Sequence, residues 1–229
     1  KHKKRLLRVM NKTLFRTLQA CAVLALVMFF SSCSEKDDTW NPYYNWQERN
    51  TQWYETIADS ARTAISAAKS RYGEDWESHC DWRMIKTYKK SADADADLED
   101  YICVHILTRG EGRYSAAFTD SVSLNFRGWT MPTEYMNEYG ELQVMQPIFA
   151  QTYYGTYNPV TATPQKMSVS GTIDGFSTAL QYMVEGDDWL VYIPQKLGYA
   201  EKESSTIPAY SALVYRMHVV EVHRRGLSE

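Results

Sequence analysis

Hydrophobic residues recur at helical spacing near the start of the chain. Between residues 42 and 72 the apolar positions fall on one face: Trp46, Trp53, Ile57, Ala61, Ala64, Ile65 and Ala68. Asn41 followed by Pro42 is typical of a helix N-cap and first turn, and Gly73 is typical of a helix end. The pattern predicts one amphipathic helix over residues 42–72, with about eight turns.

A different period, the alternation of apolar and polar residues, marks the later part of the chain. Val122, Leu124 and Phe126 alternate with serine and asparagine, and residues 189–193 alternate in the same way before Pro194. Two further stretches are rich in β-branched and aromatic residues. The predicted strands are residues 101–108, 121–126, 189–193 and 211–222.

One short helix is predicted between these strands. Asp174 is placed to N-cap a helix that runs to about Glu185, with Phe176, Leu180 and Met183 on one face. One long helix, several strands and one short helix together indicate an α+β domain.

Two long segments show no period. Residues 129–163 contain three prolines and several tyrosines and are predicted to form a long loop. Residues 73–99 are predicted to be a connector, and its acidic end resembles the start of a calcium loop. Leu98 stands where that loop needs glycine and Val104 where it needs glutamate, so a calcium loop is excluded.

The first 32 residues have the architecture of a secretory signal peptide. Seven lysines and arginines come first, Leu18 to Phe30 is mostly apolar, and two serines precede Cys33. The apolar run is short for a spanning helix, although an uncleaved anchor helix is the alternative. The position of Cys33 resembles a bacterial lipobox, with Phe30 in place of the usual leucine. This predicts lipidation at Cys33 and a lipid-anchored protein of the cell envelope, at the outer membrane, facing the periplasm or the cell surface.

The net charge becomes more negative once residues 1–32 are left out. The whole chain carries 25 basic and 28 acidic residues, and residues 1–32 hold seven of the basic residues and none of the acidic ones. The remainder has a net charge of −10, which excludes binding to nucleic acid or anionic lipid through nonspecific charge.

Cysteine and histidine indicate no metal or cofactor. Cys80 and Cys103 follow Cys33, and both a disulfide between them and two buried thiols are open interpretations. The histidines of the later chain lack metal-ligand spacing: His79, His105, His218 and His223. No metal, nucleotide or redox cofactor is therefore expected.

Residues 120–222 contain a series of short segments in a characteristic order: NFRGW, GTIDGF, ALQYM, YIP, LGY, IP and LVY. In order and spacing they resemble the domain of FKBP-type peptidyl-prolyl isomerases. The resemblance implies a half-open antiparallel β-sheet wrapped over one short α-helix, preceded here by the long N-terminal helix. The expected division is a signal peptide (1–32), a linker (33–41), a helix (42–72), a connector (73–99) and an FKBP-like domain (100–224).

The resemblance also implies a proline-binding site. The positions matched to catalytic residues are Ile173, whose backbone N–H would hold a substrate carbonyl, Phe176 as the floor, and Tyr199 as a hydrogen-bond donor. The positions matched to substrate-binding residues are Phe126, Phe149, Met167, Thr172, Ile207 and Tyr215. Several residues depart from the family pattern: Phe126 replaces tyrosine, Phe176 replaces tryptophan, Ala150 replaces aspartate, and Met167 stands near a usual aromatic residue.

Prolyl isomerisation needs few chemical groups. The barrier is the lost amide resonance of the twisted C–N bond, about 18–20 kcal/mol, and no nucleophile is required. An apolar site favours the twisted amide, and a few donors hold the flanking carbonyls. The resemblance thus predicts an isomerase that acts on X-Pro bonds in unfolded or partly folded exported proteins.

Two questions stay open at this point. The lost polar groups are also consistent with a weak or inactive FKBP-like binding module, a chaperone or a surface binder of peptide or glycan that uses the tyrosine-rich loop 129–163. The helix over 42–72 either packs on the chain's own sheet or forms a homodimer, as in some periplasmic members of the family.

Overall fold

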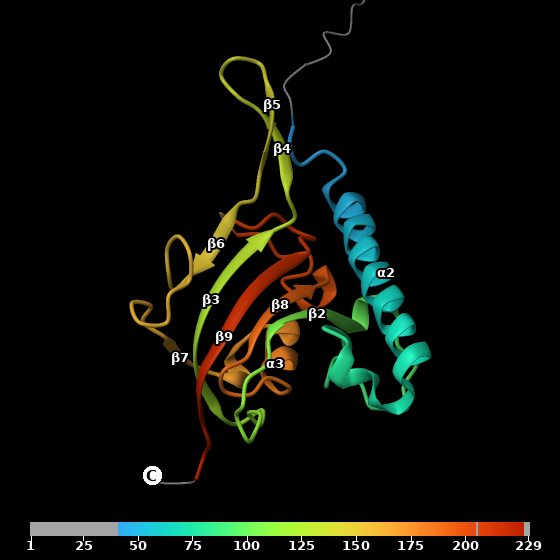
Figure 1. Cartoon of the computed structure of the whole chain (residues 1–229). Helices are drawn as coiled ribbons and strands as arrows, with labels where there is room; N and C mark the ends of the chain where they lie inside the picture. The colour runs from blue at the N-terminus through green and yellow to red at the C-terminus, as the bar shows by residue number, and fades with distance from the viewer. Residues whose placement is uncertain (1–40, 205, 227–229) are drawn as a thin grey trace, which may run out of the picture. The chain divides into compact units, whose positions relative to one another are not determined.

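The computed structural model describes residues 41–204 and 206–226 (Figure 1). The predicted signal peptide, the predicted lipidation site Cys33 and most of the predicted linker lie outside the described residues. Within the described part, no helix has both the length and the apolar content that crossing a bilayer requires.

A seven-stranded antiparallel sheet forms the centre of the fold. Its order is β1-β2-β8-β9-β3-β6, and β7 pairs with β3 on the same edge as β6. The strands are β1 (Trp82–Lys86), β2 (Tyr101–Thr108), β3 (Ser121–Thr130), β6 (Ile148–Gln151), β7 (Gln165–Ser168), β8 (Asp188–Ile193) and β9 (Leu213–His223). The four strands predicted from the sequence are confirmed as β2, β3, β8 and β9, and the α+β fold class is confirmed.

One face of the sheet, the inner face, packs on the short helix α3 (Asp174–Leu180). Every second residue of each strand points to this face, as Val104, Val191 and Met217 do, and these side chains are fully buried. This apolar cluster is the main core, and it forms because the strand period of two matches the alternation in the sequence.

The other face, the outer face, is covered in part by the long helix α2 (Trp46–Tyr72), which runs along the side of the sheet in Figure 1. Tyr54, Ala58 and Ala61 pack on Cys103, and Trp53 meets Tyr192 edge-on at 6.0 Å between ring centroids. The apolar face of the helix therefore packs on the chain's own sheet. A homodimer through this segment stays an untested prediction.

The start of α2 differs from the predicted N-cap. Asn41 accepts a hydrogen bond from the Tyr43 N–H at 2.9 Å through its side chain and closes a separate turn. The helix begins at Trp46 after Asn45, whose φ of 48° is left-handed. The Asn41-Pro42 pair thus starts a turn, and the helix begins four residues later than predicted.

The end of α3 also differs from prediction. The helix stops at Leu180 instead of continuing to about Glu185. The Val184 N–H donates to the Asp187 carboxylate at 2.7 Å, and Gly186 has a φ of 91°. A side-chain acceptor thus takes an N–H that a longer helix would have paired with its own backbone.

Both aperiodic segments contain regular structure that the sequence pattern did not indicate. The expected connector 73–99 includes the 3₁₀ helices η1 (Gly73–His79) and η2 (Leu98–Asp100) and the edge strand β1. The expected loop 129–163 includes β6 and a separate hairpin of β4 (Thr133–Met136) and β5 (Leu142–Met145), which projects from the sheet in Figure 1. All four residues of β5 are exposed, so no buried face imposes an alternating pattern on that strand, whereas β4 buries Thr133 and half-buries Tyr135.

The two described cysteines are free thiols. Cys80 and Cys103 are both buried and unpaired. The Tyr54 hydroxyl donates to the Cys103 sulfur at 3.4 Å, and burial raises the pKa of that thiol to about 11. Cys103 therefore acts as an apolar residue under helix α2.

Helix α3 packs so closely on β8 that a methyl group added at Gly175 is predicted to lower the stability of the fold. A Cβ at Gly175 would overlap the Ile193 side chain, whereas a Cβ at Gly171 would meet only Ser168 Cβ, at 3.7 Å. We expect Gly175→Ala to lower the free energy of unfolding by about 1–3 kcal/mol, although alanine favours helix. Gly171→Ala should change it by less than about 0.5 kcal/mol. Urea denaturation of both variants tests this, and equal stabilities would contradict it.

Candidate functional site

Three aromatic rings from three elements meet on the inner face of the sheet. Phe126 from β3, Phe176 from α3 and Tyr215 from β9 are 8%, 3% and 5% exposed. Phe176 meets Tyr215 at 4.9 Å between centroids and Phe126 at 5.8 Å, both edge to face. Phe149 from β6 adds a fourth ring, 5.4 Å from Tyr215. We call these four residues the aromatic cluster.

Gly128 allows this cluster to close. It lies opposite Tyr215 in the pairing of β3 with β9. A Cβ at Gly128 would lie 2.7 Å from Tyr215 Cε1 and 2.8 Å from Phe149 Cζ, so only glycine lets both rings come this near. The sequence prediction missed this residue, and the signal that could have found it is a glycine inside an alternating strand.

More exposed side chains surround the buried rings. Tyr199 is 40% exposed, and Ile173 and Met167 are half-buried against the core. Burial raises the pKa of the Tyr215 hydroxyl well above its usual range, and the neighbouring Tyr199 hydroxyl raises it further. Tyr215 therefore stays protonated at neutral pH, next to the hydroxyl of the partly exposed Tyr199.

The start of α3 contributes a backbone donor. The Ile173 carbonyl accepts from the Ser177 N–H at 2.9 Å, but the Ile173 N–H donates to no acceptor among the described residues. The Thr172 hydroxyl donates to the Val169 carbonyl at 2.9 Å, so this side chain is used within its own turn. Ile173 thus offers a free N–H and Thr172 does not offer a free hydroxyl.

The structure places most of the sequence-predicted residues in or against one apolar cluster. Those gathered there are Phe126, Phe149, Met167, Ile173, Phe176, Ile207 and Tyr215. Tyr199 lies beside Tyr215, and the half-buried Ala150 packs on the same apolar cluster. The Thr172 side chain does not join this cluster, because its hydroxyl is bonded to the Val169 carbonyl. The arrangement combines an apolar aromatic surface with two donors for carbonyl groups, the Ile173 N–H and the Tyr199 hydroxyl. Their roles in binding stay predictions.

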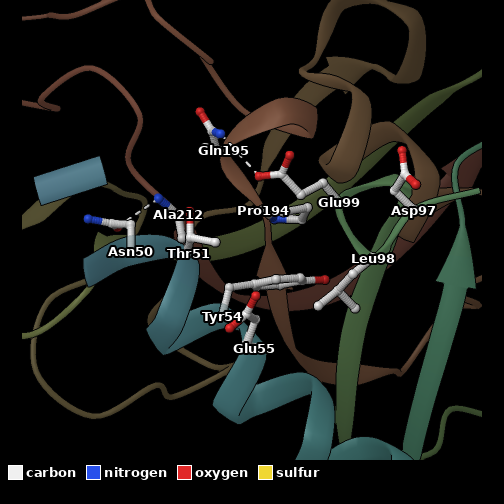
Figure 2. A pocket seen from close by; sticks show the side chains of 10 residues that line it. All are labelled: Asn50, Thr51, Tyr54, Glu55, Asp97, Leu98, Glu99, Pro194, Gln195 and Ala212. Atoms are coloured by element: carbon white, nitrogen blue, oxygen red, sulfur yellow. Dashed lines mark hydrogen bonds between the residues drawn. The ribbon is translucent and has the colours of Figure 1, made fainter. Parts of the chain in front are cut away.

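A cavity of about 150 Å³ lies between α2, η2 and the segment after β8. Figure 2 shows Tyr54 and Leu98 on one side of it and Pro194 and Gln195 on the other. Asn50 and Ala212 close one end. None of the predicted site residues lines this cavity.

A second cavity of about 500 Å³ lies at the start of β8 and along residues 218–220 of β9. His218 of the outer face lines it, and Tyr157 of the long loop stacks on the His218 ring at 3.6 Å between centroids. The imidazole Nδ1 faces Asp188 at 3.3 Å, and Arg216 donates to the same carboxylate at 2.7 Å. Burial lowers the pKa of His218 to about 4, and the attraction of Asp188 offsets only part of this effect. Among the described residues, no group of three or more His, Cys, Asp or Glu is placed to hold a metal ion.

Residues 114–220 match the family model described as FKBP-type peptidyl-prolyl cis-trans isomerase. A curated relative, the FKBP-type 22 kDa peptidyl-prolyl cis-trans isomerase of Escherichia coli (strain K12), is 37% identical over 60 residues. Those residues are 26% of this chain and 29% of the relative, so the chain spans less than a third of that protein's length.

Two solved structures are distant neighbours. The peptidyl-prolyl cis-trans isomerase of Pseudomonas syringae pv. tomato is 20% identical, with 74% of this chain and 96% of that chain covered and a TM-score of 0.42. FkpA from Escherichia coli is 15% identical, with 90% and 82% covered and a TM-score of 0.42. Neither likeness bears on activity.

The burial of His218 predicts a pH dependence of stability. Its pKa is about 4 when folded, against about 6.5 when unfolded, so the folded state excludes a proton that the unfolded chain accepts. The resulting stabilisation is complete above about pH 6.5 and is lost as pH falls toward 4. We expect a loss of about 1–3 kcal/mol over that range.

We would measure urea denaturation of the wild-type protein and of His218→Gln at a series of pH values. The comparison separates the effect of His218 from that of the carboxylates, which titrate in both proteins. The variant should lose stability less steeply between pH 6.5 and 4.5. A His218 ring that titrates near pH 6.5 by NMR in the folded protein would contradict the prediction.

Proposed function

Because residues 114–220 belong to the FKBP-type peptidyl-prolyl cis-trans isomerase family, we propose that this protein catalyses cis-trans isomerisation of X-Pro bonds at the aromatic cluster. One observation carries the proposal: rings from β3, α3 and β9 meet edge to face on the inner face of the sheet, with the Ile173 N–H and the Tyr199 hydroxyl beside them.

The proposed mechanism is binding and desolvation of the prolyl amide. The proline ring contacts Phe126, Phe176 and Tyr215, an apolar surface that favours the twisted amide over the more dipolar planar form. The Ile173 N–H and the Tyr199 hydroxyl donate to carbonyls of the bound peptide and hold it in place. No nucleophile or proton transfer is needed.

The proposed substrates are proline-containing segments of unfolded or partly folded exported proteins. The support is the pattern of the first 33 residues, whose cationic start, apolar run and Cys33 are typical of a lipoprotein signal. We place the protein in the cell envelope, anchored to the membrane by lipid.

A second candidate function is a binding module of low or no activity. Ala150, which packs on the aromatic cluster, removes the carboxylate that the family pattern has at this position. The outer-face cavity beside Tyr157 of the long loop is a separate concave surface for a peptide or glycan. This function predicts binding without acceleration of isomerisation.

An isomerase assay on a set of X-Pro tetrapeptides distinguishes the two functions. The purified full chain is expected to accelerate cis-trans exchange. Tyr199→Phe removes one donor and should lower kcat/KM about fivefold, the effect of about 1 kcal/mol. Phe176→Leu alters the floor of the site and should lower kcat/KM further.

Tyr154→Phe is the matched control for Tyr199→Phe. Tyr154 is 85% exposed in the long loop, and its loss of a hydroxyl should leave the rate unchanged. Circular dichroism must show that each variant is folded. No acceleration by folded wild-type protein would rule out the isomerase and leave the binding module.

A further inference from the structure

The segment after β8 carries two of the predicted site residues. It comprises residues 194–204 and 206–212, and we call it the site loop. Tyr199 and Ile207 belong to it, and Tyr215 follows three residues after its end. The position of this loop therefore decides where the Tyr199 hydroxyl and the Ile207 side chain lie relative to the aromatic rings.

Helix α2 binds the C-terminal end of the site loop. The Trp46 indole N–H donates to the Ser211 hydroxyl at 2.9 Å, and that hydroxyl donates to the Pro208 carbonyl at 2.6 Å. The Ala212 N–H donates to the Asn50 side chain at 2.8 Å, the contact drawn as a dashed line in Figure 2. These side chains are buried, and they lie more than 160 residues from their partners in sequence.

The turn η2 binds the N-terminal end. The Gln195 side chain donates to Glu99 at 3.0 Å, and Lys196 forms an ion pair with Asp100 at 2.7 Å. The Asp100 side chain is 2% exposed and is also paired with Lys90. Burial would raise the pKa of Asp100, but the hydrogen bonds from Lys196 and Lys90 outweigh it and hold the pKa well below its usual range.

The backbone of the loop is strained between these two ends. Ala200 and Tyr210 have φ values of 52° and 60°, in the left-handed region that favours glycine. The Tyr210 N–H donates to the Ala200 carbonyl at 2.6 Å, so a hydrogen bond joins the two strained residues across the loop. Such conformations persist where the surrounding structure holds them. The contacts with η2 before Ala200 and with α2 after Tyr210 provide that support.

We propose that α2 and η2, which lie outside the family-matched residues 114–220, hold both ends of the site loop and thereby position Tyr199 and Ile207 for the substrate. The proposal rests on the isomerase function proposed above. Trp46, Asn50 and Glu99 act as positioning residues, because none of them belongs to the aromatic cluster or the core around it. A loop that is already ordered spares the substrate the cost of ordering it on binding.

Two variants weaken the α2 contact. Trp46→Phe removes the indole donor, and Ser211→Ala removes the hydroxyl that links Trp46 to Pro208. Each should raise KM for X-Pro peptides about fivefold with little change in kcat, since a looser loop weakens ground-state and transition-state binding alike. Ser211→Thr keeps the hydroxyl and should restore the wild-type KM.

Trp53→Phe is the control for general loosening of helix α2. Trp53 lies on the same helix and meets Tyr192 of the sheet, but it makes no hydrogen bond to the site loop among the described residues. This variant can lose stability, and its KM should stay at the wild-type value.

Amide hydrogen exchange gives a readout that does not depend on activity. In Trp46→Phe and Ser211→Ala the amides of Tyr210 and Ala212 should exchange about fivefold faster, while those of β3 stay unchanged. Unchanged exchange at both amides in folded variants would overturn the anchoring. Faster exchange with an unchanged KM would overturn the positioning role. A wild-type protein without isomerase activity would refute the proposed function, and exchange alone would then decide whether α2 anchors the loop.

Discussion

Strand β9 is the constraint on which the two faces of this protein depend. It pairs with β3 along one edge and with β8 along the other, and both registers are fixed. Tyr215 and Met217 therefore point to the inner face, and Val214, Arg216 and His218 point to the outer face. A slip of one residue would exchange the two sets, burying Arg216 in the core and removing Tyr215 from the aromatic cluster. Two paired edges make such a slip costly.

Helix α2 connects the outer face of the sheet to the candidate site. That helix packs on Cys103 and Tyr192 of the sheet, and in this position it reaches the end of the site loop through Trp46 and Asn50. The contacts of the helix with the sheet are mostly apolar, with the Tyr54 hydroxyl bonded to the Tyr101 carbonyl, and near its start Asn50 supplies the acceptor that the Ala212 N–H needs. The helix thus buries apolar surface and supplies hydrogen bonds to a loop on which two site residues lie.

Much of the candidate site was accessible from sequence because it lies in elements with a strong pattern. Phe126 and Tyr215 lie on two strands that the sequence predicted, and Phe176 lies on the predicted short helix. The family resemblance implied that these three rings converge. Gly128 was missed because its role depends on two rings from other strands. The anchors Trp46 and Asn50 were missed as such because their partners lie more than 160 residues away, and no local pattern encodes that distance.

The sequence by itself determined the α+β class, the four predicted strands and an amphipathic helix that ends before Gly73, because periodicity and residue type are local properties that burial imposes on each element. Only the tertiary structure decided the elements whose bounds or burial differ from the sequence prediction. Strand β5 is exposed at every residue, α2 starts at Trp46 because Asn41 closes its own turn, and α3 stops at Leu180, with the Val184 N–H taken by Asp187. Tertiary structure also decided what α2 covers, since an apolar stripe specifies that a face is buried and does not specify its partner.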